Sequence, residues 1–227
     1  MHYLGLALYA EGRTDYYFLC PLLQRLCEDI CAQEANQLVE ISAVLRLDHP
    51  YTSDNAPRAI RIRDAAKLAN GAWRILFVHA DGSADPGRAR DQQAQPAIDR
   101  LRQEFAGQGL GVAVIPVRET EAWAMADGDA LRRVFDTSLS DKDMGLPTTA
   151  RALESDTDPK ATLNAAFSLT MPSGRRKRQG VSPLLNGVGE QASLQRLREL
   201  TAFASMEAEL RQALKTLRIL PSESGAS

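Results

Sequence analysis

The chain has 227 residues and a formal net charge of −2, with hydrophobic (44%) and charged (25%) fractions typical of a globular protein. This balance excludes a global basic field, so any contact with nucleic acid must come from a local patch. No apolar run approaches the roughly 20 residues of a membrane span, and the N-terminal segment lacks the basic start of a signal peptide. Three cysteines, an odd count, fit a reducing compartment. We therefore expect a cytoplasmic protein without a membrane partner.

Strands and helices are expected to alternate along the first part of the chain. Short apolar runs that end in turn residues predict strands at residues 3–10, 39–47, 74–79 and 112–117. Segments with helical periodicity follow each of them, at residues 14–35, 58–68, 87–108 and 119–135. Such alternation is typical of a mostly parallel sheet with right-handed crossovers. We therefore expect an α/β domain over residues 1–136.

The pattern changes after about residue 136. Residues 137–158 are polar and rich in turn formers, and a short helix is expected at 160–169. An amphipathic helix is expected at 190–220, with a break near Thr201. We predict a helical extension over residues 137–220, packed on the first domain, and a flexible tail over 221–227.

Two basic segments are candidates for a local patch that contacts nucleic acid. The first is a run of four cations between two glycines: Arg175, Arg176, Lys177 and Arg178. Charge runs are usually only solvated, but adjacent cations on a loop also suit phosphate contacts, and we predict nucleic-acid binding there. The second segment holds three arginines that we expect to form a helix face rather than such a contact: Arg58, Arg61 and Arg63.

Acidic side chains follow the predicted strands at the points where the strands end. They are Glu11 and Asp15 after the first strand, Asp81 and Asp85 after the third, and Glu119 and Glu121 after the fourth, with Asp48 as a weaker candidate after the second. In a parallel sheet, ligands bind in the crevice beyond the carboxyl ends of the strands. Clustered carboxylates need a cation or protons to neutralise them, and hard oxygen ligands suit Mg²⁺ or Mn²⁺. The sequence therefore predicts a metal site for phosphate chemistry.

Each acid also has a simpler interpretation. We prefer Asp15 as an acid in the first turn of a helix, where its charge interacts favourably with the positive end of the helix dipole, and an accessory place in the site is the alternative. Asp81 and Asp85 suit an ordinary turn. Glu119 and Glu121 lie two apart and do not share a helix face, so only one is expected to point into the site, and we prefer Glu121. Arg118 beside them either pairs with an acid or clamps a phosphate.

Three segments resemble a known family when they are taken together. EGRTDYYFLCPLL, HADGSAD and RETEAWAMAD, each after a predicted strand, are similar in order and placement to a bacterial Toprim-like family of unassigned function, related to OLD-type nucleases. The DPK at residues 158–160 fits the C-terminal half of that family, so the resemblance spans most of the chain. Members are often encoded beside SMC-like or OLD-like ATPases, and several such pairs look like antiphage systems.

The resemblance implies a Toprim fold and Mg²⁺-dependent phosphodiester chemistry. Glu11 would be the motif's glutamate, with an acid–base or metal-binding role. The Asp-x-Asp pair of the family falls on residues 79–81, where His79 departs from the pattern and Asp81 keeps it. Asp85 would replace the missing ligand, and Glu119 or Glu121 would supply a further carboxylate. Imidazole is a poorer Mg²⁺ ligand than carboxylate, so His79 would tolerate Mn²⁺ or hydrogen-bond to the scissile phosphate.

Two functions of different classes follow from this resemblance. The first is a metal-dependent nuclease, with DNA as the first expected substrate, acting in antiphage defence. The alternative is a catalytically inactive Toprim-like module that binds and regulates a partner ATPase, which His79 and the amphipathic C-terminal helix favour. A phosphoacceptor domain would need a lysine after a late strand, and none lies near Val117. A small-molecule phosphohydrolase remains a further alternative.

Overall fold

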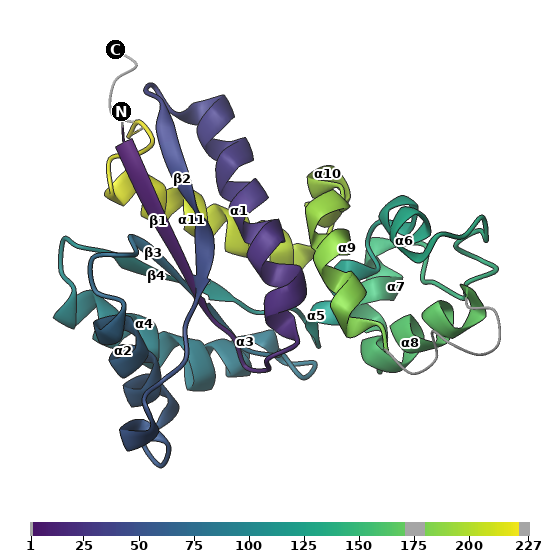
Figure 1. Ribbon diagram of the computed structural model, residues 1–227, viewed down its shortest axis with the longest axis horizontal. Coiled ribbons are helices and arrows are strands. Elements are labelled where there is room, and N and C mark those ends of the chain that lie inside the picture. The colour runs from purple at the N-terminus through teal and green to yellow at the C-terminus, as the bar shows by residue number, and fades with distance from the viewer. Residues whose placement is uncertain (1, 171–179, 223–227) are drawn as a thin grey trace.

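A central sheet of four parallel strands organises the chain in the computed structural model, which describes residues 2–170 and 180–222. The strands are β1 (His2–Tyr9), β2 (Val39–Arg46), β3 (Ile75–His79) and β4 (Leu110–Val114), in the order β2-β1-β3-β4 (Figure 1). Every residue of β3 is buried, as expected for a central strand that is covered on both faces. The basic run at 175–178 and the end of the predicted tail lie outside the described residues.

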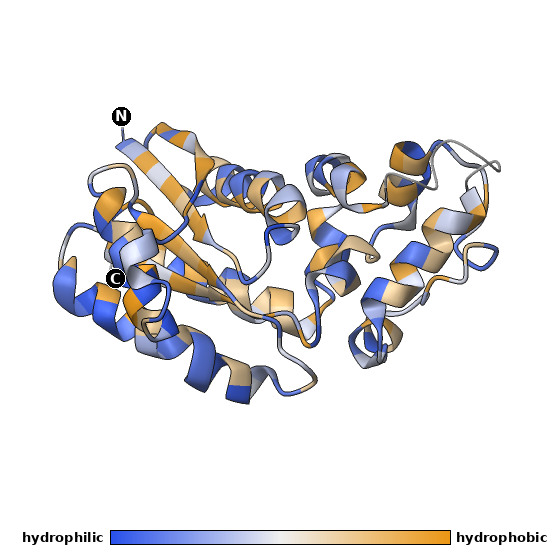
Figure 2. Cartoon of the chain, turned by 60° about the horizontal axis from the view of Figure 1, so that its bottom comes forward, coloured by the Kyte–Doolittle hydropathy of each residue, from blue (hydrophilic) through white to orange (hydrophobic). Residues whose placement is uncertain are grey.

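Helices cover both faces of the sheet, because alternate strand residues point to opposite sides. On one face, leucines of β1 pack against α1 (Asp15–Glu34) and α11 (Thr201–Thr216). On the other face, Ala7 and Tyr9 pack against α2 (Arg58–Leu68) and α4 (Gln95–Glu104). Figure 2 shows the hydrophobic strands between helices whose outer surfaces are hydrophilic. The predicted α/β class with a parallel sheet is confirmed, and the arrangement is consistent with a Toprim-like fold.

The strand order creates a crevice between β1 and β3. The chain leaves β1 through α1 to reach β2 on one side, and then returns past β1 through α2 to reach β3 on the other. The helix after β1, α1, and the helix after β3, α4, lie on opposite faces of the sheet, so the segments that leave β1 and β3 diverge. Ligands of open α/β sheets bind at such a reversal of strand order. Glu11 and Asp81 follow the two strands that border this crevice.

Two of the predicted helices are divided. The segment predicted at 87–108 consists of α3 (Pro86–Ala89), a π-helical turn (Arg90–Ala94) and α4, because Pro96 has no amide hydrogen to continue the regular bonding. The segment predicted at 119–135 is divided into α5 (Thr120–Ala124) and α6 (Gly128–Phe135). Asp127 caps α6 by accepting hydrogen bonds from two of its first amides.

A helical lobe lies at one end of the molecule (Figure 1). Besides α5 and α6 it contains α7 (Ala150–Ser155), α8 (Pro159–Thr170), α9 (Leu185–Gln191) and α10 (Leu194–Leu197). It is attached to α1, where the Arg25 guanidinium donates to the carbonyl groups of Gly189 and Ala192. The single helix predicted at 190–220 corresponds to the end of α9, to α10 and to α11 in the structure. Helix α11 begins at Thr201, where a break was predicted. The domain division at residue 136 stays a prediction.

Helix α11 returns from the lobe to the sheet and covers its edge strand β4. A Glu209 carboxylate oxygen accepts a hydrogen bond from the Ala113 amide at 3.1 Å, and the other pairs with Arg90 at 2.6 Å. An edge strand with unpaired amides is a site of unwanted strand pairing, so this side chain protects β4. None of the helices in the described part of the chain is both long and apolar enough to cross a bilayer.

Candidate functional site

His79, the last residue of β3, joins the ends of three elements. Its imidazole is fully buried, and Nδ1 accepts a hydrogen bond from the Glu11 amide at 3.3 Å. The Nε2 atom, on the other side of the ring, is 3.0 Å from the Thr120 hydroxyl oxygen. The ring therefore ties the segment after β1 to the end of β3 and the first turn of α5. Sequence reasoning placed His79 in the site without anticipating this linking role.

Glu11 and Asp81 lie side by side in the crevice. A Glu11 carboxylate oxygen accepts a hydrogen bond from the Asp81 amide at 2.9 Å, although 70 residues separate them. The Asp81 Oδ1 atom lies 3.5 Å from His79 Nε2, and it is buried without a hydrogen-bond partner among the described residues. A buried carboxylate oxygen without a partner is costly, so it marks a position where a ligand would be stabilised.

Asp15 is the third acid at this centre. It is the first residue of α1, and its Oδ2 atom accepts from the Gly12 amide at 2.9 Å while lying 3.5 Å from His79 Nδ1. Burial raises the pKa of Asp15, the nearby His79 opposes that rise, and the negative charge of Asp81 adds to it. Asp15 thus occupies the first helical turn and the site at once.

Each of the remaining predicted acids has a further structural role or contact. Asp85 is exposed and caps α3, since Oδ1 accepts from the Arg88 amide at 2.9 Å. Glu119 accepts from the Lys160 amide at 3.3 Å, which connects it to α8. Glu121 is almost fully buried, and burial raises its pKa; the charge of Lys160 opposes the rise, and those of Glu119 and Asp15 reinforce it.

The loop after β3 is held tightly against the segment after β4. Ala84 donates to the Val117 carbonyl at 2.9 Å, and Ser83 donates to the Arg118 carbonyl at 3.3 Å. Ser83 and Ala84 both have positive φ angles, 48° and 72°, which are strained for residues with a side chain. Such strain persists only where the surroundings enforce it. The Arg118 guanidinium donates to the Thr157 carbonyl at 3.5 Å.

The residues present fit a magnesium-type ion at Glu11 and Asp81. Within the described ranges, no three His, Cys, Asp or Glu side chains converge on a point where they could hold a metal by themselves. Mg²⁺, however, is commonly bound through one or two carboxylates, with waters and substrate phosphates completing its shell. The unpartnered Asp81 oxygen and the exposed Glu11 carboxylate are donors of this kind. A two-carboxylate site open to substrate is therefore compatible with the structure.

Two cavities meet at Glu11. The smaller, about 280 Å³, is lined by Asp81, Ser83 and Asp85 among others. The larger, about 770 Å³, is lined by arginines and tyrosines from α1, α2 and the ends of β1 and β2. We call the larger one the arginine cleft; its cationic residues are Arg13, Arg46, Arg58 and Arg61.

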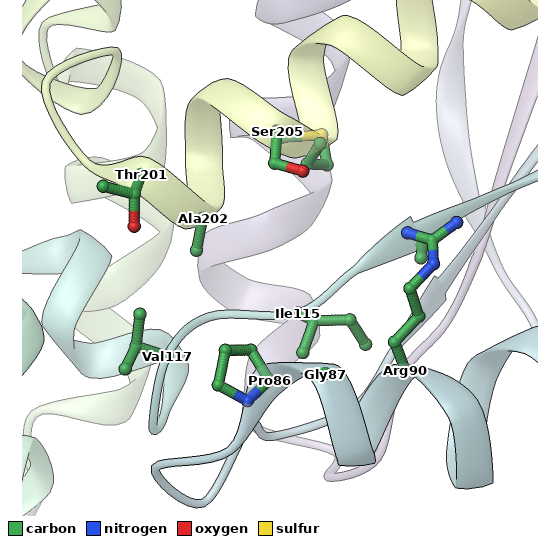
Figure 3. A pocket seen from close by; sticks show the side chains of 10 residues that line it. Pro86, Gly87, Arg90, Ile115, Val117, Thr201, Ala202 and Ser205 are labelled. Atoms are coloured by element: carbon green, nitrogen blue, oxygen red, sulfur yellow. The ribbon is translucent and has the colours of Figure 1, made fainter.

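A third cavity, about 290 Å³, lies between α3, β4 and α11 (Figure 3). It is mainly apolar, with Pro86 and Ile115 facing Ala202 of α11, and Figure 3 shows Arg90 at its margin. None of the predicted acids lines it, and Arg90 is already paired with Glu209. The groups suited to phosphate chemistry are therefore concentrated around Glu11 rather than here.

The three arginines of α2 are all half-buried, and they divide between two surroundings. Arg58 and Arg61 are half-buried and line the arginine cleft, whereas Arg63 pairs with Glu104 at 3.2 Å. Spacing could have revealed this, because residues three apart share a helix face and residues two apart do not. The helix also begins after the loop that follows β2, which puts its N-terminus at the carboxyl edge of the sheet.

Comparisons with protein-family models, with curated proteins and with solved structures each give no match to this chain.

Proposed function

We propose that the chain is a metal-dependent nuclease that hydrolyses phosphodiester bonds of nucleic acid and acts in antiphage defence. The observation that carries the proposal is the pair formed by Glu11 and Asp81 at the reversal of strand order. One oxygen of Asp81 is buried without a partner, and Glu11 opens into the arginine cleft. Carboxylates beside guanidinium groups match a divalent cation and the phosphate that it activates.

Three roles are assigned to residues of the site: binding the ion, positioning the acids and contacting the phosphate. Glu11 and Asp81 would hold the ion, which supplies an activated water and polarises a phosphoryl oxygen when bound. His79 positions both acids, since it fixes the Glu11 backbone and lies against Asp81. Arg58 donates to the His79 carbonyl and lines the arginine cleft, so its guanidinium is available to a phosphate beside Glu11.

The test is cleavage of plasmid DNA, single-stranded DNA and RNA with Mg²⁺ or Mn²⁺, comparing the wild type with Glu11→Gln. We expect the variant to lose at least about 100-fold in rate, the scale of a missing acid–base group. Glu40→Gln is the matched control, because Glu40 is an exposed acid at the start of β2, opposite Tyr3 at the start of β1, whereas Glu11 follows the other end of β1. Thermal melting should show both variants folded. Equal rates for wild type and Glu11→Gln would reject the proposal.

A second candidate is a regulatory Toprim-like module for a partner ATPase, and the engaged acids favour it. Asp85 caps a helix, Glu119 is bonded to the Lys160 amide, and a buried imidazole stands at residue 79. Such a module would bind the ATPase encoded beside it and alter its rate of hydrolysis, with no cleavage by either protein. Measuring ATP hydrolysis and nucleic-acid cleavage with the two proteins together separates the candidates.

A further inference from the structure

The arginine cleft carries a local excess of positive charge in a protein that is negative overall. Its lining includes four guanidinium groups against two carboxylates, Glu11 and Asp48. The whole chain, by contrast, has a formal net charge of −2. A concave surface lined by one sign of charge concentrates counter-ions of the other sign. The cleft therefore favours an anionic ligand.

Its arginines also lack the carboxylate partners that several other arginines in the described part of the chain have. Arg63, Arg132 and Arg198 are each paired with two carboxylates. Within the described residues, Arg46, Arg58 and Arg61 form no ion pair with a carboxylate. The Nε atoms of Arg58 and Arg61 are also buried without a hydrogen-bond partner, a feature that Arg63 and Arg74 share outside the cleft. Donors withdrawn from water need an acceptor, and the fork of a guanidinium group matches the oxygens of a phosphate.

Aromatic rings lie directly against these cations. The Arg46 guanidinium is 5.9 Å from the Tyr16 ring centre and 5.6 Å from that of Tyr17, and Arg58 is 5.5 Å from the Tyr9 ring. The Tyr16 ring is fixed, because its hydroxyl donates to the Leu47 carbonyl at 2.6 Å. Stacked guanidinium and aromatic planes are the surfaces on which unpaired bases pack in single-strand binding sites.

We propose that the arginine cleft binds one nucleotide unit of single-stranded nucleic acid, with its phosphate on Arg46 and Arg61 and its base against Tyr17. A volume of about 770 Å³ is in the range of sites that enclose small organic ligands. The bases of a duplex are stacked inside it, so only a single strand can present a base to the rings. Glu11 lines both cavities, so the adjoining phosphodiester lies beside Glu11 and Asp81. This last step rests on the proposed function, whereas the binding itself does not.

The test is equilibrium binding in the presence of EDTA, so that neither metal nor cleavage enters the measurement. Fluorescent DNA of about 12 nucleotides, within the range of single-strand site sizes, is titrated with protein as a single strand and as a duplex. The variants are Arg46→Ala and Arg61→Ala, and the matched control is Arg102→Ala, an exposed arginine on α4 whose partner is Asp99. Arg58 is left unchanged because it supports the His79 carbonyl.

We expect each cleft variant to weaken single-strand binding by roughly tenfold and to lower the salt slope by about 0.7, as for the loss of one phosphate contact. Tyr17→Ala should weaken binding by roughly fivefold or more, and Tyr17→Phe should restore it because the ring is what stacks. Arg102→Ala should bind as the wild type does. Wild-type affinity in both arginine variants, or tighter binding of the duplex, would overturn the inference.

The two proposals fail in different measurements. If the cleft variants lose binding in EDTA but the wild type cleaves nothing with either metal, single-strand binding in the arginine cleft is supported and the proposed nuclease activity is rejected. If Glu11→Gln abolishes cleavage while Arg46→Ala and Arg61→Ala bind and cleave normally, the nuclease activity is supported and single-strand binding in the arginine cleft is rejected.

Discussion

Gly82 should be the least replaceable residue of the loop after Asp81. A Cβ atom placed there would lie 2.2 Å from the Pro116 carbonyl oxygen and 2.5 Å from that of Val117. Both are backbone atoms and cannot rotate away, so the loop must move by about 1 Å to restore ordinary contact. Overpacking of this kind costs about 1 to 3 kcal/mol, and each loop hydrogen bond that is lost costs about 1 kcal/mol more.

Two such bonds, from Ser83 and Ala84 to the segment after β4, hold this loop. We therefore expect Gly82→Ala to lower the free energy of unfolding by about 3 kcal/mol. For a chain of this size that corresponds to a fall of roughly 10 °C in Tm. The displaced loop would also carry Asp81 away from Glu11, whose 2.9 Å bond to the Asp81 amide would be lost, so cleavage should fall as well.

The measurement is urea unfolding, with Gly87→Ala as the matched control. Gly87 lies five residues further on, in α3, and an added Cβ would meet only Asp85 Oδ1 at an ordinary 3.6 Å. Alanine is preferred over glycine within helices by up to about 1 kcal/mol, so this control should be as stable as the wild type or slightly more so. A free energy of unfolding for Gly82→Ala within about 0.5 kcal/mol of the control would refute the reasoning.

Two further predictions concern buried carboxylates. Burial raises the pKa of Glu121 in the folded state above its ordinary value of 4.5, because the buried carboxyl group is favoured in its protonated form. The stability that this protonated form contributes is complete below pH 4.5 and is lost as the pH rises through the raised pKa of the folded state. The Glu121→Gln variant should therefore unfold at a higher urea concentration than the wild type near neutral pH, and the difference should vanish below the ordinary pKa of glutamate. A difference that grows as the pH falls would contradict the raised pKa of Glu121. Asp127 accepts from the Asp129, Ala130 and Ser193 amides, so Asp127→Ala should lose about 1 kcal/mol as a helix cap and about 2 kcal/mol more from the unpaired Ser193 amide. Asp127→Asn keeps an acceptor and should lose clearly less; equal losses in the two variants, measured by urea unfolding, would argue against the capping role.

The fold class and the position of the acids along the chain could be predicted from the sequence. Local patterns decide these features: the apolar run of β3 is long enough for a strand and too short for a helix, and α2 has the predicted bounds. Once strands alternate with helices, a parallel sheet follows, and residues such as Glu11 and Asp81 must lie at its carboxyl edge. None of this depends on which strands are neighbours.

The composition of the site depended on the tertiary structure. The sheet order makes β1 and β3 neighbours, which brings the Glu11 carboxylate to the Asp81 amide and the His79 ring between Glu11 and Thr120. Asp85 caps α3 through Oδ1 while lining the same cavity as Glu11 and Asp81, a combination that depends on the path of its loop, and its role as a metal ligand stays a prediction. Arg58 and Arg61 join the site only because α2 starts beside the ends of β1 and β2. Local periodicity specifies elements and their faces, whereas contacts between distant segments depend on the order in which strands pair, which no local pattern encodes.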